Sequence, residues 1–255
     1  MIDKINQIVQ QAGNIATDYF GRVKIDYKTD HSVVTEADLA VEKYLREKLT
    51  RLIPASGFLG EESEVDDDNL DKEFLWIVDP IDGTSSYCNK LPIWGVSVAL
   101  FRDQQPYLTS IYFPYVNNTF WVDDKGNAFE NGNKLITLKS GEKLRPESFI
   151  CIPSKIYYRC MMKVRIKARS FGSTCYHVLQ TARDSAFATL IGDYKIWDLA
   201  GAVTVSEKTG AQIFNLKGEI VPIKTYLNLG RDADPLILTH PDRIAQVLDK
   251  IEIKC

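Results

Sequence analysis

The sequence predicts a mixed α/β protein in which residues 1–255 form a single unit. Apolar residues recur at helical spacing near the N-terminus, whereas the part that follows consists of short apolar runs divided by turn residues. We therefore expect helices packed on a large, mainly antiparallel sheet over 1–140. Strands and helices alternate after about Gly141, which predicts a smaller α/β half over 141–255. No flexible linker separates the halves, so one unit is favoured over two independent domains.

Two helices are expected first. Apolar residues at helical spacing predict an opening amphipathic helix over Ile2–Tyr19. A second helix is expected from Glu36 to about Leu52, with Thr35 as its N-cap and Asp38 at its third position. Pro54 follows just after the end of this helix, as is common for a residue that cannot continue one.

The remaining elements are expected as short segments between turns. In the first half, apolar runs predict strands at Phe74–Val78, Trp94–Phe101, Leu108–Phe113 and Thr119–Val122. In the second half, strands are expected at Phe149–Ile152, Ala186–Ile191 and a run through Ile213. Helices are expected there at Tyr176–Arg183 and Asp198–Thr209.

Composition and charge exclude several classes of protein. The 45% apolar and 25% charged residues are typical of a soluble globular protein, and a net charge of −3 argues against sequence-independent nucleic-acid binding. The densest basic stretch, Lys163–Arg169, is short, and a solvated surface face is the favoured interpretation. No apolar run reaches the roughly 20 residues of a membrane span, and no signal peptide is evident. The five scattered cysteines indicate reduced thiols in a cytoplasmic protein.

The motif Asp79-Pro80-Ile81-Asp82-Gly83-Thr84 follows directly after a predicted buried strand. A turn there can aim the carboxylates of Asp79 and Asp82 into one space, together with the carbonyl of Ile81. Hard cations such as Mg²⁺ prefer oxygen ligands of this kind. Gly83 permits an unusual backbone angle, and the hydroxyl of Thr84 could position a water molecule.

Each acidic residue also has a simpler explanation. Asp-Pro and Asp-Gly are common turn dipeptides. Glu61 and Glu62 could form a solvated loop, and Asp198 could be only a helix N-cap. Asp38 could serve only in a capping box at the start of its helix.

Their joint occurrence favours a shared function. The segments Thr-Glu-Ala-Asp (35–38), Gly-Glu-Glu-Ser (60–63), Trp-Ile-Val-Asp-Pro-Ile-Asp-Gly-Thr (76–84) and Trp-Asp-Leu-Ala-Gly-Ala (197–202) stand in this order, with a Gly-Ser pair at 172–173. In this combination the sequence closely resembles the inositol monophosphatase family of lithium-sensitive, Mg²⁺-dependent phosphatases, over nearly the whole chain. The resemblance implies a layered αβαβα sandwich of the inositol monophosphatase and fructose-1,6-bisphosphatase type, and a single catalytic unit.

The resemblance also implies a set of metal ligands, with two to three Mg²⁺ ions in the site. Glu61, Asp79 and the carbonyl of Ile81 would hold one ion. Asp79, Asp82 and Asp198 would hold a second, and a third, weaker ion would rest on Glu61 and water. Such ions lower the pKa of bound water and stabilise the leaving alkoxide, so no covalent nucleophile is needed.

Catalytic and substrate-binding roles follow from the same resemblance. Thr84 would orient the attacking water with Asp38 behind it, and Glu61 would share in catalysis. Lys28 lies near the family's active-site lysine. Substrate would be bound by Asp82, Gly83, Thr84, Ser173 and Asp198.

The implied substrate is a small phosphorylated metabolite, inositol 1-phosphate or a related sugar phosphate by default. Inositol phosphatases usually carry a hydroxyl-binding glutamate about seven residues before the aspartate of the Trp-Asp-x-Ala-Gly motif. Ile191 stands there in this chain, or Leu190 with a one-residue gap, and Asp193 and Lys195 are the nearest polar residues. A 3'-phosphoadenosine nucleotide or histidinol phosphate is therefore an alternative substrate, and a non-catalytic regulatory binding protein is a further alternative. The resemblance also suggests a homodimer.

Overall fold

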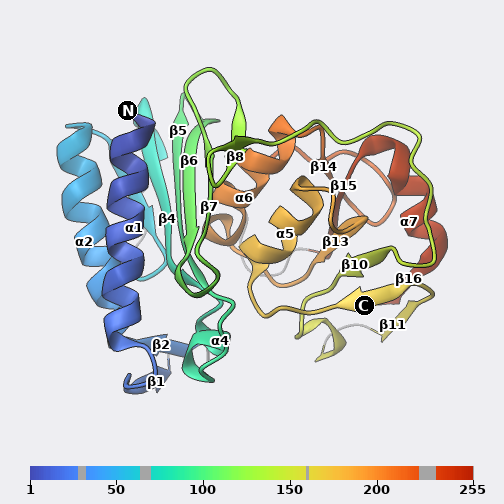
Figure 1. The fold of residues 1–255 in the computed structure, drawn as a ribbon, viewed down its shortest axis with the longest axis horizontal. Helices are drawn as coiled ribbons and strands as arrows, with labels where there is room; N and C mark the ends of the chain where they lie inside the picture. Colours follow the sequence, from blue (N-terminus) through green and yellow to red (C-terminus); the bar gives the residue numbers. More distant parts are fainter. Residues whose placement is uncertain (28–32, 64–69, 159–160, 224–233, 255) are drawn as a thin grey trace.

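The computed structural model describes residues 1–27, 33–63, 70–158, 161–223 and 234–254. Figure 1 shows five successive layers: α1 and α2, a large sheet, α5 and α6, a second sheet, and α7. The predicted layered αβαβα arrangement is therefore confirmed. No helix in the described part of the chain is long and apolar enough to cross a membrane.

The first layer consists of α1 (Ile2–Tyr19) and α2 (Glu36–Leu52), at the predicted bounds. The Thr35 side chain accepts from the amides at the start of α2, and Asp38 accepts from the Thr35 amide at 2.9 Å. This reciprocal capping box satisfies amides that would otherwise lack partners. The apolar faces of both helices pack on the large sheet in one buried cluster that also contains Trp76 and Trp94.

The large sheet has seven strands in the order β3-β4-β5-β6-β7-β8-β9. Only the β3–β4 pair is parallel, so the predicted mainly antiparallel sheet is confirmed. Its strands are β3 (Gly57–Gly60), β4 (Phe74–Asp82), β5 (Gly95–Arg102), β6 (Gln105–Phe113), β7 (Asn118–Val122), β8 (Ala128–Glu130) and β9 (Asn133–Lys134). Helix α4 (Thr84–Cys88) follows β4, and the hairpin β1–β2 (Ile25–Tyr27, Val33–Thr35) precedes α2.

The second sheet has five strands in the order β12-β10-β13-β15-β14. Its strands are β10 (Phe149–Cys151), β12 (Lys167–Arg169), β13 (Ala188–Ile191), β14 (Gln212–Phe214) and β15 (Leu236–Thr239). Helix α7 (Ile244–Lys250) covers its outer face, and β11 (Met161–Val164) pairs separately with β16 (Ile251–Lys254).

Helices α5 (Thr174–Ala182) and α6 (Ile196–Lys208) lie between the sheets (Figure 1) and share one buried cluster with both of them. Both begin two residues earlier than predicted. Ser173 caps α5 by accepting from the Tyr176 amide at 3.0 Å, and Asp198 accepts from the Lys195 amide at 2.6 Å. Asp198 is therefore the third residue of α6 and not its N-cap.

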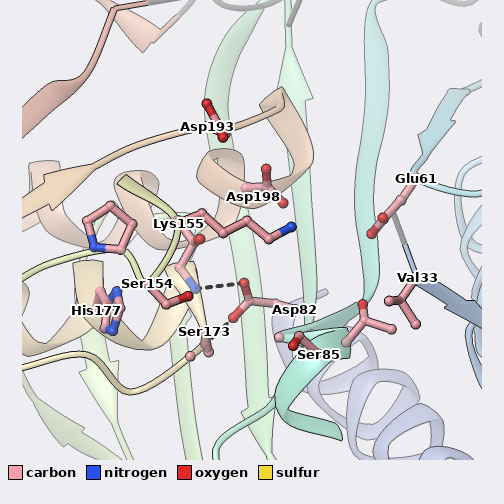
Figure 2. A pocket seen from close by; sticks show the side chains of 15 residues that line it. Val33, Glu61, Asp82, Ser85, Ser154, Lys155, Ser173, His177, Asp193 and Asp198 are labelled. Atoms are coloured by element: carbon pink, nitrogen blue, oxygen red, sulfur yellow. Dashed lines mark hydrogen bonds between the residues drawn. The ribbon is translucent and has the colours of Figure 1, made fainter. Parts of the chain in front are cut away.

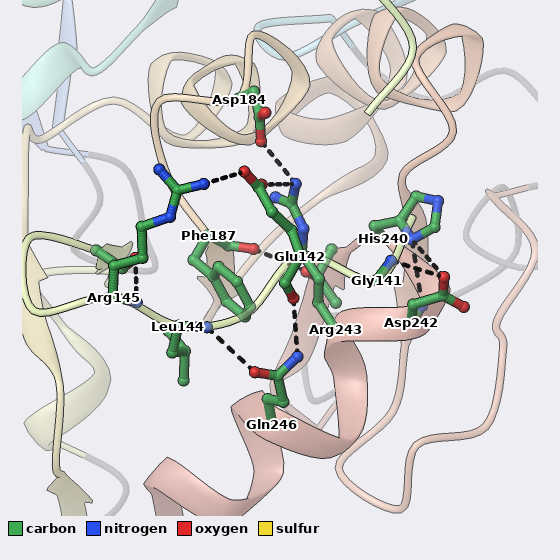
Figure 3. A network of polar contacts seen from close by, with 12 residues as sticks. Gly141, Glu142, Leu144, Arg145, Asp184, Phe187, His240, Asp242, Arg243 and Gln246 are labelled. Atoms are coloured by element: carbon green, nitrogen blue, oxygen red, sulfur yellow. Dashed lines mark hydrogen bonds and ion pairs between the residues drawn. The ribbon is translucent and has the colours of Figure 1, made fainter. Parts of the chain in front are cut away.

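A buried arginine fixes the N-terminal end of α7 to the second sheet (Figure 3). The Arg243 side chain is 1% exposed, and its Nη2 contacts carboxylate oxygens of Glu142 at 2.6 Å and Asp184 at 2.8 Å. Its guanidinium also lies over the Phe187 ring. Since buried charges need such partners, this cluster ties the segment before β10 to α7.

Candidate active site

The two aspartates of the Asp79–Asp82 turn lie inside β4 and not after it, so the predicted strand Phe74–Val78 was too short. Residues three apart in a regular strand face opposite sides of a sheet. The register against β5, however, passes from Asp79↔Ser97 to Asp82↔Gly95, which inserts one extra residue in β4. This bulge directs both carboxylates to one side, and it tolerates Pro80, which has no amide to donate.

Two glycines bring distant segments together beside the bulge. A Cβ on Gly83, whose φ is +92°, would lie 3.0 Å from the Gly172 carbonyl oxygen. A Cβ on Gly172, whose φ is +85°, would lie 2.1 Å from Ser86 Oγ. The Gly-Ser pair therefore packs directly against the start of α4 because neither glycine carries a side chain.

This contact lets the start of α5 hold Asp82. The Ser173 hydroxyl donates to one carboxylate oxygen of Asp82, and the Thr174 amide donates to the other at 3.0 Å. The Cys175 amide adds a third bond at 3.2 Å. Burial raises the pKa of Asp82 to about 6, although these three hydrogen bonds oppose the rise.

Asp198 reaches the same region from α6. A Cβ on Gly201, in the motif Trp-Asp-Leu-Ala-Gly, would lie 2.4 Å from Ser97 Oγ on β5 and 3.2 Å from Thr109 Oγ1 on β6. Glycine thus allows α6 to lie close on the large sheet. Burial raises the pKa of Asp198 well above its usual value, and the charge of Glu61 adds to this rise.

Glu61 stands on the loop after β3, and a residue that the sequence analysis missed holds this loop. Glu42 of α2 is 4% exposed and accepts from the Glu62 amide at 2.8 Å and from the Ser63 hydroxyl. A Cβ on Gly60 would lie 2.4 Å from the Glu42 carboxylate. The signal was present in the sequence, since Glu42 lies on the apolar face of α2, four residues after Asp38.

Asp79 lies beneath the other carboxylates. It is 1% exposed, and its Oδ1 has no hydrogen-bond partner among the described residues. Burial raises the pKa of Asp79 well above its usual value, and the negative charges of Glu61, Asp82 and Asp198 raise it further. The predicted carboxylates therefore do come together, and they form a buried cluster that repels itself.

Asp38 is also buried near this cluster, but its bonds are those of the capping box. Both Thr35 donors bond its Oδ2, the hydroxyl at 2.6 Å, and its Oδ1 has no partner within the described chain. Burial raises the pKa of Asp38 to about 6, and the charge of Glu61 contributes. Neither hydroxyl nor amide of Thr84 bonds Asp38 here; the Thr84 hydroxyl donates to the Ile81 carbonyl at 3.0 Å.

A cavity of about 230 Å³ opens beside the carboxylates. Six of the predicted residues line it: Glu61, Asp82, Gly83, Thr84, Ser173 and Asp198. Asp38, Asp79 and Ile81 lie beneath its wall and not at its surface. Lys28 lies outside the described residues.

The opposite wall contains residues that the sequence analysis did not assign: Pro153, Ser154, Lys155 and His177. Figure 2 shows the Lys155 side chain extending into the cavity. Pro153 packs against Gly192, where a Cβ would lie 2.9 Å from its Cγ, and this brings the wall beside Asp193. Asp193 lines the cavity, whereas Ile191 is buried in the core. No sequence motif marked this wall, because a short loop after β10 contributes three of these four residues.

The described side chains around the cavity are not arranged as a metal site. Among the residues that the structure describes, no three His, Cys, Asp or Glu side chains are arranged to hold a metal ion. Asp82 and Asp198 instead accept hydrogen bonds from the Ser173 hydroxyl and from backbone amides. The donor set is nevertheless all oxygen, and the buried Oδ1 of Asp79 lacks a partner.

The αβαβα fold occurs in known structures. The IMPase of Thermotoga maritima matches with a TM-score of 0.81 over 97% of this chain and 95% of that chain, at 19% identity. The chain belongs to the inositol monophosphatase family, whose sequence model matches residues 1–249, and it is a phosphatase.

Two curated relatives cover most of the chain. A histidinol-phosphatase of Chlorobaculum parvum is 29% identical over 223 residues, which are 83% of this chain and 84% of that protein. An inositol-1-monophosphatase of Caulobacter vibrioides is 29% identical over 238 residues, which are 86% of this chain and 92% of that protein. These relatives differ in the substrate that their names give.

Proposed function

We propose that the protein is a Mg²⁺-dependent phosphomonoester hydrolase that acts as a single catalytic unit on a small phosphate ester. The observation that carries this proposal is the carboxylate cluster under the cavity, with the unpartnered Oδ1 of Asp79 at its centre. Without a cation, the charges of Glu61, Asp82 and Asp198 raise the pKa of Asp79. Divalent cations would remove this repulsion, and the oxygen donors suit Mg²⁺.

The ligands would be those that the family resemblance implies: Glu61, Asp79, the Ile81 carbonyl, Asp82 and Asp198, holding two to three ions. When bound, Mg²⁺ supplies an acidified water and a counter-charge for the leaving oxygen. The Ile81 carbonyl accepts one bond from Thr84 and retains a second lone pair.

The residues around these ligands would position water and phosphate. Because the Thr84 hydroxyl donates to Ile81, its lone pairs are left to accept a bond from water in the cavity. Asp82 is held by three donors from the start of α5, so its orientation is fixed before substrate binds. Such preorganisation would hold the carboxylate ready to bind a cation, whose positive charge would face the negative charge of the transition state.

The substrate proposed by default is inositol 1-phosphate or a related sugar phosphate, with its alcohol portion against Ser154, Lys155, His177 and Asp193. Asp193 also favours a second candidate, histidinol phosphate, because a carboxylate complements the ammonium group of that substrate. Lys155 would complement the additional phosphate of a 3'-phosphoadenosine nucleotide. Ile191 cannot contact any of these, since it is buried in the core.

The test is phosphate release from inositol 1-phosphate, histidinol phosphate, fructose 1,6-bisphosphate and 3'-phosphoadenosine 5'-phosphate, each with and without Mg²⁺. Release should require Mg²⁺ and should favour one compound. Asp79→Asn should reduce turnover by about 100-fold or more, because it removes a charge that two ions would share. Asp124→Asn, in an exposed turn, is the matched control and should retain activity.

Near-normal turnover of Asp79→Asn would contradict the metal proposal. Mg²⁺ binding without release from any compound would favour the non-catalytic binding protein. The homodimer and the cytoplasmic location stay predictions.

A further inference from the structure

A regular row of cations runs from β11 into β12, over residues 163–169. Every second side chain in this row is basic and exposed: Lys163, Arg165, Lys167 and Arg169. The intervening side chains are half-buried against the cluster under α7: Val164, Ile166 and Ala168. Exposed basic side chains therefore alternate with half-buried apolar ones across both strands and the bend at Ile166 between them.

Two further cations from distant segments meet this row. Arg145, before β10, and Lys250, at the end of α7, line a hollow of about 400 Å³ together with Arg165 and Lys167. The Ser148 hydroxyl lines the same hollow, and no carboxylate does. Three separate segments thus converge on one basic hollow in a chain whose net charge is −3.

Backbone contacts hold these segments in place. The Arg165 amide donates to the Lys250 carbonyl at 2.9 Å, and the Arg145 amide donates to the Ser148 hydroxyl at 3.0 Å. The Leu144 amide donates to Gln246 of α7 at 3.1 Å. The hollow is therefore built before any ligand arrives, which reduces the entropy cost of binding.

The charges in the hollow are only partly balanced. Arg145 pairs with Glu142 at 3.0 Å, and Lys250 pairs with Asp249 at 2.7 Å. Within the described residues, neither Arg165 nor Lys167 forms an ion pair. Here like charges are gathered in a concave site, which favours a multiply charged anion.

We propose that this hollow binds a linear oligophosphate. Arg165 and Lys167 are two residues apart and line the hollow together with Arg145 and Lys250. One orthophosphate can meet only part of such a row, whereas a chain of phosphates can meet several cations at once. The arginines suit this ligand because a guanidinium binds phosphate oxygens in pairs. The chain could be inorganic or part of a nucleotide.

The site is separate from the proposed catalytic one. The hollow shares no lining residue with the acidic cavity. In metal-free buffer the carboxylates of that cavity repel anions, so polyphosphate binding there is disfavoured. A result at the basic hollow is consequently independent of whether the proposed Mg²⁺-dependent activity is correct.

The test is isothermal titration calorimetry of the full chain with inorganic tripolyphosphate, in buffer freed of divalent cations. We expect one binding site per chain, much weaker binding of orthophosphate, and weaker tripolyphosphate binding at higher salt. The double variant R165S/K167S should lose about tenfold or more in affinity. R165K/K167R keeps the charges and should retain binding. Phosphate release by R165S/K167S should equal that of the wild type, which shows that the variant is folded.

A matched control removes the same charge elsewhere. K72S/K125S replaces two exposed lysines outside the hollow and should bind tripolyphosphate normally. Adenosine triphosphate distinguishes the two sources: tighter binding than tripolyphosphate indicates a nucleotide, and equal binding indicates that the phosphate chain suffices. No binding at millimolar tripolyphosphate would overturn the proposal. So would unchanged binding by R165S/K167S, or an equal loss in K72S/K125S.

Discussion

At the scale of single residues, Asp79 combines a cost in stability with a proposed role as metal ligand. Its side chain is buried, and burial together with the charges of Glu61, Asp82 and Asp198 raises its pKa. Because the folded pKa exceeds the unfolded one, this group favours the folded state at low pH. That contribution is lost as pH rises through the folded pKa. The ionised cluster therefore destabilises the metal-free protein at neutral pH.

Asp79→Asn should consequently stabilise the metal-free protein while removing activity. We expect a higher Tm at pH 8 and a smaller difference as pH is lowered toward the ordinary pKa of an aspartate, because burial and the neighbouring charges raise the pKa of Asp79. Each kcal/mol should shift Tm by about 2–4 °C in a chain of this size. Thermal unfolding in chelator-treated buffer measures this, with Asp124→Asn as control. A lower Tm at pH 8 would show that Asp79 is not repelled by its neighbours.

His177 is a second residue whose charge matters for stability. Its Nε2 accepts from the Phe171 amide at 2.7 Å, and burial lowers the pKa of His177 to about 4. The folded state requires the neutral ring, so the contribution of His177 to the free energy of unfolding is complete above pH 6.5. This contribution is lost as pH falls from about 6.5 to about 4.

His177→Gln should remove this part of the acid sensitivity. The difference between pH 7 and pH 4 in the free energy of unfolding should shrink by roughly 3 kcal/mol, since each pKa unit corresponds to about 1.4 kcal/mol. Urea unfolding at several pH values measures it. His240→Gln is the matched control because that histidine follows β15 and does not line the cavity. An unchanged pH dependence in His177→Gln would contradict the assignment.

At the scale of elements, the close approach of α6 to the large sheet positions Asp198. Gly201 permits this approach, because a Cβ there would lie 2.4 Å from Ser97 Oγ. Gly201→Ala should therefore displace α6 and reduce both stability and activity. Overpacking of this kind costs about 1–3 kcal/mol. Denaturant unfolding and phosphate release measure the two effects.

The double variant Gly201→Ala with Ser97→Ala tests the cause. Removing the Ser97 hydroxyl should restore part of the loss, which gives a favourable coupling between the two positions. Strict additivity of the two single effects would indicate that the contact with Ser97 is not the source of the loss.

The elements also show what could and could not be predicted from sequence. Local signals were sufficient for α2, whose cap and apolar spacing placed both ends. They were insufficient for β4, because the bulge between Asp79 and Asp82 depends on pairing with β5. The loop of Pro153–Lys155 reaches the cavity through packing on Gly192, which no local pattern encodes.

At the scale of the whole molecule, the site is assembled from both sheets and from the helices between them. The resemblance could assemble the carboxylates because four motifs marked them. The resemblance could not predict the cavity wall opposite the carboxylates, or the role of Glu42. Both depend on contacts between segments that are distant in the sequence. The described structure also has no group of three side chains ready to hold a metal. The proposed cation would therefore require these side chains to rearrange.

Mg²⁺ should therefore stabilise the protein, and the effect should depend on pH. Burial raises the pKa of Asp82 to about 6, so below that pH protons compete with the cation for the cluster. At pH 7.5 and a Mg²⁺ concentration of 100 times Kd, we expect the free energy of unfolding to rise by about 2.7 kcal/mol. At pH 5 the same concentration should have much less effect. Differential scanning calorimetry measures both, and Asp79→Asn should respond weakly at either pH. An equal effect at pH 5 and pH 7.5 would place the cation away from these carboxylates.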